Sequence, residues 1–384
     1  MKFRHRFFYA FFRPLVILFN RIKFGYKYKK ATDLPENYIV LSNHATDFDP
    51  ILVASSFPKQ MYFVGSEHIT RWPVIYKFLK FGFEPIIRYK GTVATSTVMK
   101  ILRKTRGGGN VCMFAEGVRT WDGVTSPILP STAQLVKAAR CGLVTYKLTG
   151  GYFTSPMWSE GGGTRRGELR GEVVGVYIKE QLAAMSDDEV FEIINRDLYE
   201  DAYERQLANP KRYKGKRLAE RLENLLFICP ECNGHGTMSS SGDTVSCTCG
   251  HSFRYDEYGM LHGTKFTTVR DFARWQKEKV REDCAEDVIY TAESASLSII
   301  KSGSAMHITD GAMSMSREVL RVGDESFELS KIPNMAMHGK HALVFSTSDG
   351  YFEIIPSKNS TTLKFLLLFD AIKEYSNKKI ETEL

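Results

Sequence analysis

Acidic residues are missing from the first thirty positions of the chain, although nine basic residues lie there. Over all 384 residues, 52 lysines and arginines stand against 44 acidic residues, so the charges nearly balance beyond residue 30. This balance excludes the broad basic face that nucleic-acid binding needs, and we expect no nucleic-acid partner. The local excess of positive charge instead favours an anionic surface as the partner of the segment that holds Lys2, Arg4, Arg6, Arg13, Arg21, Lys23, Lys27, Lys29 and Lys30.

A long uninterrupted apolar run is also missing. The most apolar stretch, residues 7–20, is broken by an Arg-Pro pair and is shorter than the roughly 20 residues that span a bilayer. On a helical wheel it has a polar stripe and an opposite apolar side: Arg6, Arg13 and Asn20 against Phe8, Phe12, Leu15 and Phe19. Residues 1–30 are therefore predicted to form an amphipathic helix in the headgroup region of an anionic membrane, peripheral on its cytoplasmic face. The alternative is an ordinary helix packed on the core.

Cysteine is scarce and unevenly placed. Four of the seven cysteines crowd into residues 229–249, with two, fourteen and one residues between them. An odd total with one tight cluster excludes a disulfide framework and indicates metal thiolates in a reducing compartment. The spacing is similar to that of a zinc ribbon, so we expect a structural Zn²⁺ held by Cys229, Cys232, Cys247 and Cys249. His235 and His251 are the spare candidate ligands.

The chain also lacks the Gly-x-Ser-x-Gly elbow of serine hydrolases. It does have a buried-strand pattern at residues 38–41, followed closely by His44 and Asp49. Between a strand and a helix, side chains five residues apart can turn toward each other. The carboxylate would then fix the imidazole tautomer and leave the other ring nitrogen as a base.

Two more predicted strands end in residues suited to ligand binding. Residues 83–88 form a strand pattern that ends in Arg88, and residues 111–114 form another that runs into Glu116, Gly117 and Arg119. Open α/β sheets place their sites at the carboxyl ends of strands. A glycine there lets a ligand approach the backbone, and a guanidinium suits a phosphate. We therefore expect these residues to lie beside the His–Asp pair.

The blocks Asn43-His44, Asp49-Pro50, Arg88 and residues 114–120 resemble, in order and spacing, the first three motifs of the glycerolipid (1-acyl-sn-glycerol-3-phosphate) acyltransferases. The resemblance covers about residues 30–200. It implies that a fatty acyl group moves from acyl-CoA or acyl-ACP to the hydroxyl of a lysophospholipid, foremost 1-acyl-sn-glycerol-3-phosphate, which gives phosphatidate. The implied roles are general base for His44, its partner for Asp49, acceptor binding for Glu116, Gly117 and Arg119, and a phosphate or acyl-donor contact for Arg88.

Another function remains open on the same residues. The chain could be a non-catalytic membrane adaptor on an acyltransferase scaffold, binding a partner through its C-terminal modules.

The C-terminal modules are predicted from residue 223 onward. A helix at residues 269–282 precedes short alternating runs over residues 286–356, with turn signals about every ten residues, and a helix at 360–375. Strands followed by one helix resemble a PH-like or GRAM-like barrel.

The predicted fold class is thus an α/β mixed sheet flanked by helices, followed by a zinc ribbon and an all-β barrel with a C-terminal helix. The expected divisions are 1–30 for the interface helix, 31–222 for the acyltransferase domain, 223–262 for the ribbon, 263–285 for a helical linker and 286–384 for the barrel.

Within the first domain, glycines between residues 150 and 163 predict a mobile loop around Tyr152, Trp158, Arg165 and Arg166. Residues 187–221 are expected to be helices that close this domain.

Overall fold

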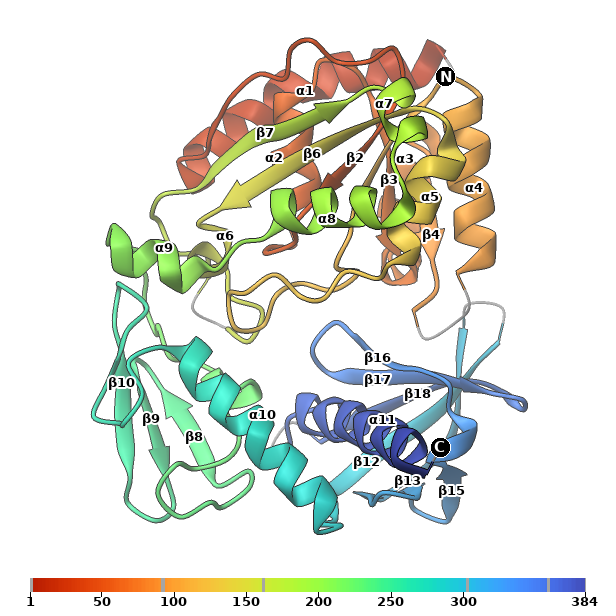
Figure 1. Cartoon of the computed structure of the whole chain (residues 1–384). Coiled ribbons are helices and arrows are strands. Elements are labelled where there is room, and N and C mark those ends of the chain that lie inside the picture. The colour runs from red at the N-terminus through yellow and green to blue at the C-terminus, as the bar shows by residue number, and fades with distance from the viewer. Residues whose placement is uncertain (1–2, 91–93, 161–162, 302–303, 358–359, 384) are drawn as a thin grey trace.

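Three β-sheets follow one another along the chain in this computed structural model (Figure 1). The structure describes residues 3–90, 94–160, 163–301, 304–357 and 360–383. The first sheet is mixed and flanked by helices, whereas the second and third are antiparallel. The expected order of an α/β unit followed by β-rich units is confirmed.

Seven strands form the first sheet in the order β1-β7-β6-β2-β5-β3-β4. They are β1 (Lys27–Tyr28), β2 (Tyr38–Ser42), β3 (Met61–Ser66), β4 (Ile86–Arg88), β5 (Asn110–Phe114), β6 (Gly142–Thr149) and β7 (Arg170–Tyr177). Strands β2 to β6 run parallel, and β7 is antiparallel to β6. Phe114 and Tyr146 both lie opposite Ser42, and Arg88 lies opposite Ser66. The carboxyl ends of the parallel strands therefore share one edge of the sheet.

Helices cover both faces of this sheet (Figure 1). The helices up to residue 208 are α1 (Phe3–Phe24), α2 (Asp49–Ser56), α3 (Pro73–Gly82), α4 (Thr95–Arg106), α5 (Ser131–Ala139), α6 (Gly151–Thr154), α7 (Lys179–Ala184), α8 (Asp187–Leu198) and α9 (Ala202–Ala208). The 3₁₀ turns are η1 (Glu67–Arg71) and η2 (Leu222–Asn224). In β2, Ile39 and Leu41 join the core under α4, α5 and α8, while Tyr38 and Val40 join the core under α2. Because both faces are buried, the strand is a continuous apolar run. After α9, residues 209–221 form neither helix nor strand, so the expected helices end earlier than predicted.

Helix α1 packs on the first domain through Arg13 and Asn20 of its polar stripe and through the buried His5, Tyr9 and Phe24, whereas Arg6 of the stripe is exposed. Arg13 Nη2 donates to the Ser55 carbonyl at 2.7 Å, and Asn20 Nδ2 donates to the Ile51 carbonyl at 3.0 Å, both on α2. The opposite side of α1 remains exposed and is apolar: Phe3, Phe7, Phe11, Leu15, Leu18, Phe19 and Ile22. Among the helices of the described residues, none is both long and apolar enough to cross a bilayer.

The second sheet is small and is followed by a long helix. Its strands are β8 (Met238–Ser241), β9 (Thr244–Cys247), β10 (Ser252–Tyr255) and β11 (Leu261–His262), in the order β11-β10-β9-β8. Helix α10 (Val269–Ala285) begins where the Thr268 side chain accepts from the Asp271 amide. Its buried Gln276 bonds to the backbone of residues 225, 227 and 228, which lead into the first cysteine turn.

The third sheet is a curled antiparallel half-barrel. Its strands are β12 (Tyr290–Lys301), β13 (Ser304–Met315), β14 (Val319–Val322), β15 (Glu325–Glu328), β16 (Met335–His338), β17 (Ala342–Thr347) and β18 (Gly350–Pro356), with a 3₁₀ turn η3 (Leu329–Lys331). The order β15-β14-β13-β12-β18-β17-β16 leaves β15 and β16 at the edges. The sheet curls enough that Phe327 of β15 lies 5.1 Å, between ring centroids, from Phe345 of β17. Helix α11 (Leu363–Glu383) packs on this unit through Phe365 and Phe369.

Candidate active site

The loop that joins β2 to α2 brings His44 and Asp49 together. His44 Nδ1 lies 2.8 Å from Oδ2 of Asp49, which is fully buried as the first residue of α2. The same oxygen accepts the backbone amides of Ala45 (2.7 Å) and Thr46 (3.0 Å), and Oδ1 accepts the Thr46 hydroxyl at 2.5 Å. An ionised carboxylate only accepts hydrogen bonds, so the His44 ring carries its proton on Nδ1 and keeps a lone pair on Nε2.

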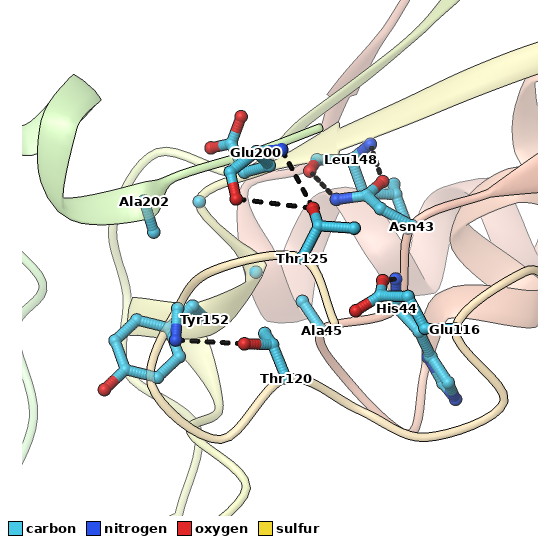
Figure 2. A pocket seen from close by; sticks show the side chains of 13 residues that line it. Asn43, His44, Ala45, Glu116, Thr120, Thr125, Leu148, Tyr152, Glu200 and Ala202 are labelled. Carbon is cyan, nitrogen blue, oxygen red and sulfur yellow. Dashed lines mark hydrogen bonds between the residues drawn. The ribbon is translucent and has the colours of Figure 1, made fainter. Parts of the chain in front are cut away.

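The His44 ring is held at the edge of the sheet while part of it stays accessible. It stacks on Phe114 at the end of β5, with ring centroids 4.3 Å apart and planes 21° apart, and its side chain is 20% exposed. Asn43, one residue earlier, bonds to both backbone groups of Leu148 and so ties the end of β2 to β6 (Figure 2). In the sequence, only the position of Asn43 directly before His44 pointed to this residue. No sequence feature marked Thr46, whose hydroxyl binds Asp49. The arrangement can hold a base that takes a proton from a bound hydroxyl.

The Glu116 side chain holds the loop that carries His44 through hydrogen bonds to backbone amides. Its Oε1 accepts the His44 backbone amide at 2.6 Å and its Oε2 accepts the Ser126 amide at 2.7 Å; Figure 2 shows the carboxylate beside His44. Burial raises the pKa of Glu116 to about 8, although these backbone hydrogen bonds oppose the shift. With both oxygens engaged by backbone, Glu116 acts as a positioning residue in this state of the site. Gly117, the next residue, turns the chain with a φ of 69°, which favours glycine.

Arg119 lies at the same edge with every part of its guanidinium engaged. Nε donates to the Ala45 carbonyl at 3.1 Å, Nη2 to the Ser155 carbonyl at 2.6 Å, and Nη1 to the Asp47 carboxylate at 2.7 Å. The Asp47 side chain is 77% exposed. An anionic ligand can therefore reach Arg119 by replacing this one carboxylate, while the two carbonyl bonds hold the guanidinium in place.

Arg88 ends β4 and is half-buried. Across the part of the chain that the structure describes, its guanidinium forms no hydrogen bond or ion pair. Of the two arginines predicted from sequence, Arg88 is thus the one whose donors are available without displacing a partner. Asp47, which competes for Arg119, could not be recognised as a site residue because nothing in its spacing distinguishes it from other loop acids.

The glycine-rich stretch after β6 is packed rather than mobile where it is described. Tyr152 and Trp158 are buried, and the buried Arg165 donates to the Tyr255 hydroxyl (3.1 Å) and the Leu218 carbonyl (2.5 Å). These aromatic and guanidinium groups join the first domain to the second sheet, which the composition of the loop could not reveal. Arg166 is exposed, and Gly161 and Gly162 lie outside the described residues.

The four clustered cysteines form a candidate metal centre. The ligand atoms of Cys229, Cys232, Cys247 and Cys249 all lie within 4.8 Å of one another, and two pairs of sulfurs are 3.8 Å apart. A tetrahedron of sulfurs at about 2.3 Å from Zn²⁺ has edges of about 3.8 Å, so the set fits this ion. His235 instead faces Asp283, with Nε2 3.2 Å from Oδ2. Among the described residues, neither His235 nor His251 belongs to the group of neighbouring ligand atoms.

Comparisons with known proteins agree with the motifs of the first domain. Residues 25–149 match the family model described as Acyltransferase. Among solved structures, the chain is similar to the 1-acyl-sn-glycerophosphate (LPA) acyltransferase PlsC from Thermotoga maritima, at 15% sequence identity and a TM-score of 0.38. That match covers 50% of this chain and 80% of the other. No curated protein matches the chain significantly.

Proposed function

Because residues 25–149 match the family model described as Acyltransferase, we propose that the chain is an O-acyltransferase acting on a lysophospholipid. The acyl donor is acyl-CoA or acyl-ACP. The acceptor is 1-acyl-sn-glycerol-3-phosphate, which becomes phosphatidate. The observation that carries this proposal is the His44–Asp49 pair, 2.8 Å apart, at the strand ends where an arginine is available.

His44 is the general base in this reaction. Its Nε2 takes the proton of the acceptor hydroxyl while the oxygen attacks the thioester carbonyl, and Asp49 stabilises the imidazolium that forms. The carbon–sulfur bond then breaks, and the thiolate takes the proton back from Nε2. Glu116 holds the backbone of this loop, which keeps the imidazole in place during the transfer.

The acceptor phosphate binds to guanidinium groups at the same edge. Arg88, whose guanidinium has no partner among the described residues, offers donors, and Arg119 gains one when the phosphate replaces the exposed Asp47 carboxylate. Gly117 leaves the backbone open beside them, because no atom lies within 4 Å of the position a Cβ would take. These groups seat the charged end of the acceptor and leave its hydroxyl for His44.

We assign structural roles to the later units. Cys229, Cys232, Cys247 and Cys249 hold one Zn²⁺ in a zinc ribbon over residues 223–262, and four thiolates leave no open position on the ion. Residues 263–285 link the ribbon to a PH-like or GRAM-like domain at 286–384, and residues 31–222 form the acyltransferase domain. The curled sheet with one C-terminal helix supports the barrel assignment.

The N-terminal segment docks the enzyme on the cytoplasmic face of an anionic membrane. The outward side of α1 carries exposed apolar residues, and α3 beside it exposes Val74, Ile75, Phe78 and Phe81, with the exposed Trp72 just before it. Phe8 of α1 contacts Phe78 and Phe81 of α3, so the two helices form one surface. Cations of residues 1–30 other than Arg13, whose guanidinium binds the Ser55 carbonyl, supply attraction to anionic lipid headgroups.

Replacing His44 tests the function. His44→Ala should lower kcat for acyl transfer from oleoyl-CoA to lysophosphatidate by about 10² or more. His262→Ala is the matched control, because His262 also pairs with an aspartate, at 2.7 Å, but on the second sheet. If folded His44→Ala protein transfers acyl groups like the wild type, the non-catalytic adaptor is the better account.

A further inference from the structure

The turn between β16 and β17 carries the C-terminal half-barrel to the edge of the first domain. Lys340 Nζ in this turn donates to the Ser159 carbonyl at 2.7 Å and lies 3.3 Å from Oε1 of Glu160. His341 Nε2 lies 2.7 Å from the same Glu160 oxygen. In Figure 1 the half-barrel accordingly lies below the edge where the parallel strands of the first sheet end.

The same hairpin is held on its other side by residues next to β3 and β4. Lys90, two residues after Arg88, donates from Nζ to the Met337 carbonyl at 3.3 Å. Arg71 at the end of η1 lies 3.3 Å from Nδ1 of His338 on β16 and also binds Glu353 of the neighbouring strand β18 at 2.6 Å. The hairpin therefore contacts the first domain both beside β4, through β16, and at the segment around Ser159, through its turn.

Lys340 and Arg119 bind the same short segment of the first domain. Arg119 donates to the Ser155 carbonyl, and Lys340 donates to the Ser159 carbonyl four residues later. Burial lowers the pKa of Lys340, and Glu160 opposes this; the charges of Arg119 and Asp47 also act on it. Lys340 and Arg119 are therefore held at the same segment, residues 155–159, by hydrogen bonds to its carbonyls.

Asp47 pairs with Arg119, and its charge also acts on two lysines. These are Lys90, on which the charge of Arg88 acts too, and Lys340. Two further carboxylates are already engaged: Glu67 with the Lys90 backbone and the Tyr351 hydroxyl, and Glu160 with Lys340 and His341. A phosphate dianion that replaces Asp47 would meet cations from two domains.

We propose that Lys340 is an acceptor-binding residue, which the C-terminal half-barrel contributes to the phosphate site formed by Arg88 and Arg119. This inference rests on the proposed function and gives the half-barrel a role in choosing the acceptor. A lysophospholipid whose phosphate is a terminal dianion can accept a third cation. A phosphodiester headgroup has fewer free oxygens and a lower charge, so it gains less from Lys340.

The first test measures equilibrium binding, without an acyl donor. Full-length protein is titrated calorimetrically with lysophosphatidate in neutral detergent micelles. Lys340→Met, which keeps the length but removes the charge, should bind about tenfold more weakly, and Lys340→Arg should restore binding. Lys331→Met is the control, because this exposed lysine of the half-barrel pairs only with Glu328 among the described contacts. Equal binding by wild type and Lys340→Met overturns the inference.

A second variant separates phosphate binding from a purely structural contact. If Lys340 only anchors the half-barrel through Glu160, then Glu160→Gln should weaken lysophosphatidate binding as Lys340→Met does, and that result overturns the inference. If Lys340 binds the phosphate, Glu160→Gln removes a competing carboxylate, and binding should stay equal or tighten. Wild-type protein that binds lysophosphatidate but transfers no acyl group contradicts the proposed function and supports the role of Lys340. Wild-type protein that does not bind it contradicts both.

Discussion

The Nδ1 atom of His44 lies 2.8 Å from an Asp49 oxygen that also accepts two backbone amides of the intervening loop. The Asp49 carboxylate therefore holds both the imidazole ring and the loop that carries it. Because one oxygen accepts from both, the tautomer of His44 and the position of its ring depend on the same acceptor. A substitution at Asp49 consequently affects both.

Asp49→Asn is expected to lower kcat at least about tenfold, but less than His44→Ala. An amide presents one acceptor oxygen where the carboxylate presents two, so at least one of the four donors around Asp49 loses its partner. Stopped assays with saturating lysophosphatidate and oleoyl-CoA measure this loss. Asp256→Asn, in the other His–Asp pair, is the control and should retain wild-type kcat. Wild-type kcat in Asp49→Asn would show that the pair has no part in catalysis.

The two arginines should respond differently to removal. Arg88→Met should raise the acceptor KM about tenfold and leave the melting temperature unchanged, because its guanidinium has no partner among the described residues. Arg119→Met should raise KM and also lower the melting temperature, because the Ala45 and Ser155 carbonyls lose their donors. Saturation kinetics and calorimetry on both variants test this. A lower melting temperature for Arg88→Met alone would reverse the two assignments.

Much of the first domain could be predicted from local pattern. The apolar runs at residues 38–41 and 111–114 became β2 and β5, because strands buried on both faces are continuous apolar runs. The strand expected at 83–88 begins only at Ile86, because Glu84 adopts a φ of 50° outside the extended region. His44 and Asp49 were recognisable because their pairing depends on a five-residue loop, which is local.

Features that depend on tertiary contacts could not be predicted in the same way. The wheel of α1 separates a polar stripe from an apolar side, but only α2, with carbonyls available at Ile51 and Ser55, places Arg13 and Asn20 of the stripe against the domain. Similarly, the ion pair between Arg119 and Asp47 joins residues that are 72 positions apart in the sequence. Lys340 lies almost 300 residues beyond His44, so no spacing rule connects the two.

Glu116 predicts a pH-dependent stability. Burial raises its pKa to about 8 from an ordinary value near 4.5, so the folded chain binds this proton more tightly than the unfolded chain. Its contribution to the free energy of unfolding is therefore full at low pH and falls as pH rises to about 8. The wild-type advantage in melting temperature over Glu116→Gln should shrink from pH 6 to pH 8 and then level off. A constant or growing difference would mean that the carboxylate is the favoured form throughout.

The metal prediction concerns the cysteine cluster. Protein purified without chelators should contain about one zinc per chain, and Cys229→Ser should lose it and melt at a lower temperature. Cys284→Ala is the control for cysteine removal, because Cys284 is buried in α10 outside the cluster and should leave the zinc content unchanged. Elemental analysis and calorimetry provide both readouts. Absence of zinc from the wild-type protein would remove the ribbon assignment.

Deleting residues 1–30 would test membrane docking poorly, because the deletion also removes Tyr9, Asn20 and Phe24 from the core. Substitutions on the outward side of α1 avoid this problem. Phe7 and Phe11 stack with centroids 6.4 Å apart and are 58% and 59% exposed. The double variant Phe7→Glu, Phe11→Glu should therefore keep the wild-type melting temperature.

The affinity of the Phe7→Glu, Phe11→Glu variant for vesicles of phosphatidylcholine and phosphatidylglycerol should fall at least about tenfold, because two aromatic side chains no longer enter the lipid. The double variant Leu207→Glu, Ile289→Glu adds the same charge at exposed apolar positions on other elements and is the matched control. Sedimentation at constant salt compares the three proteins. If both double variants lose binding equally, charge repulsion alone explains the loss, and the apolar side of α1 is not the docking surface.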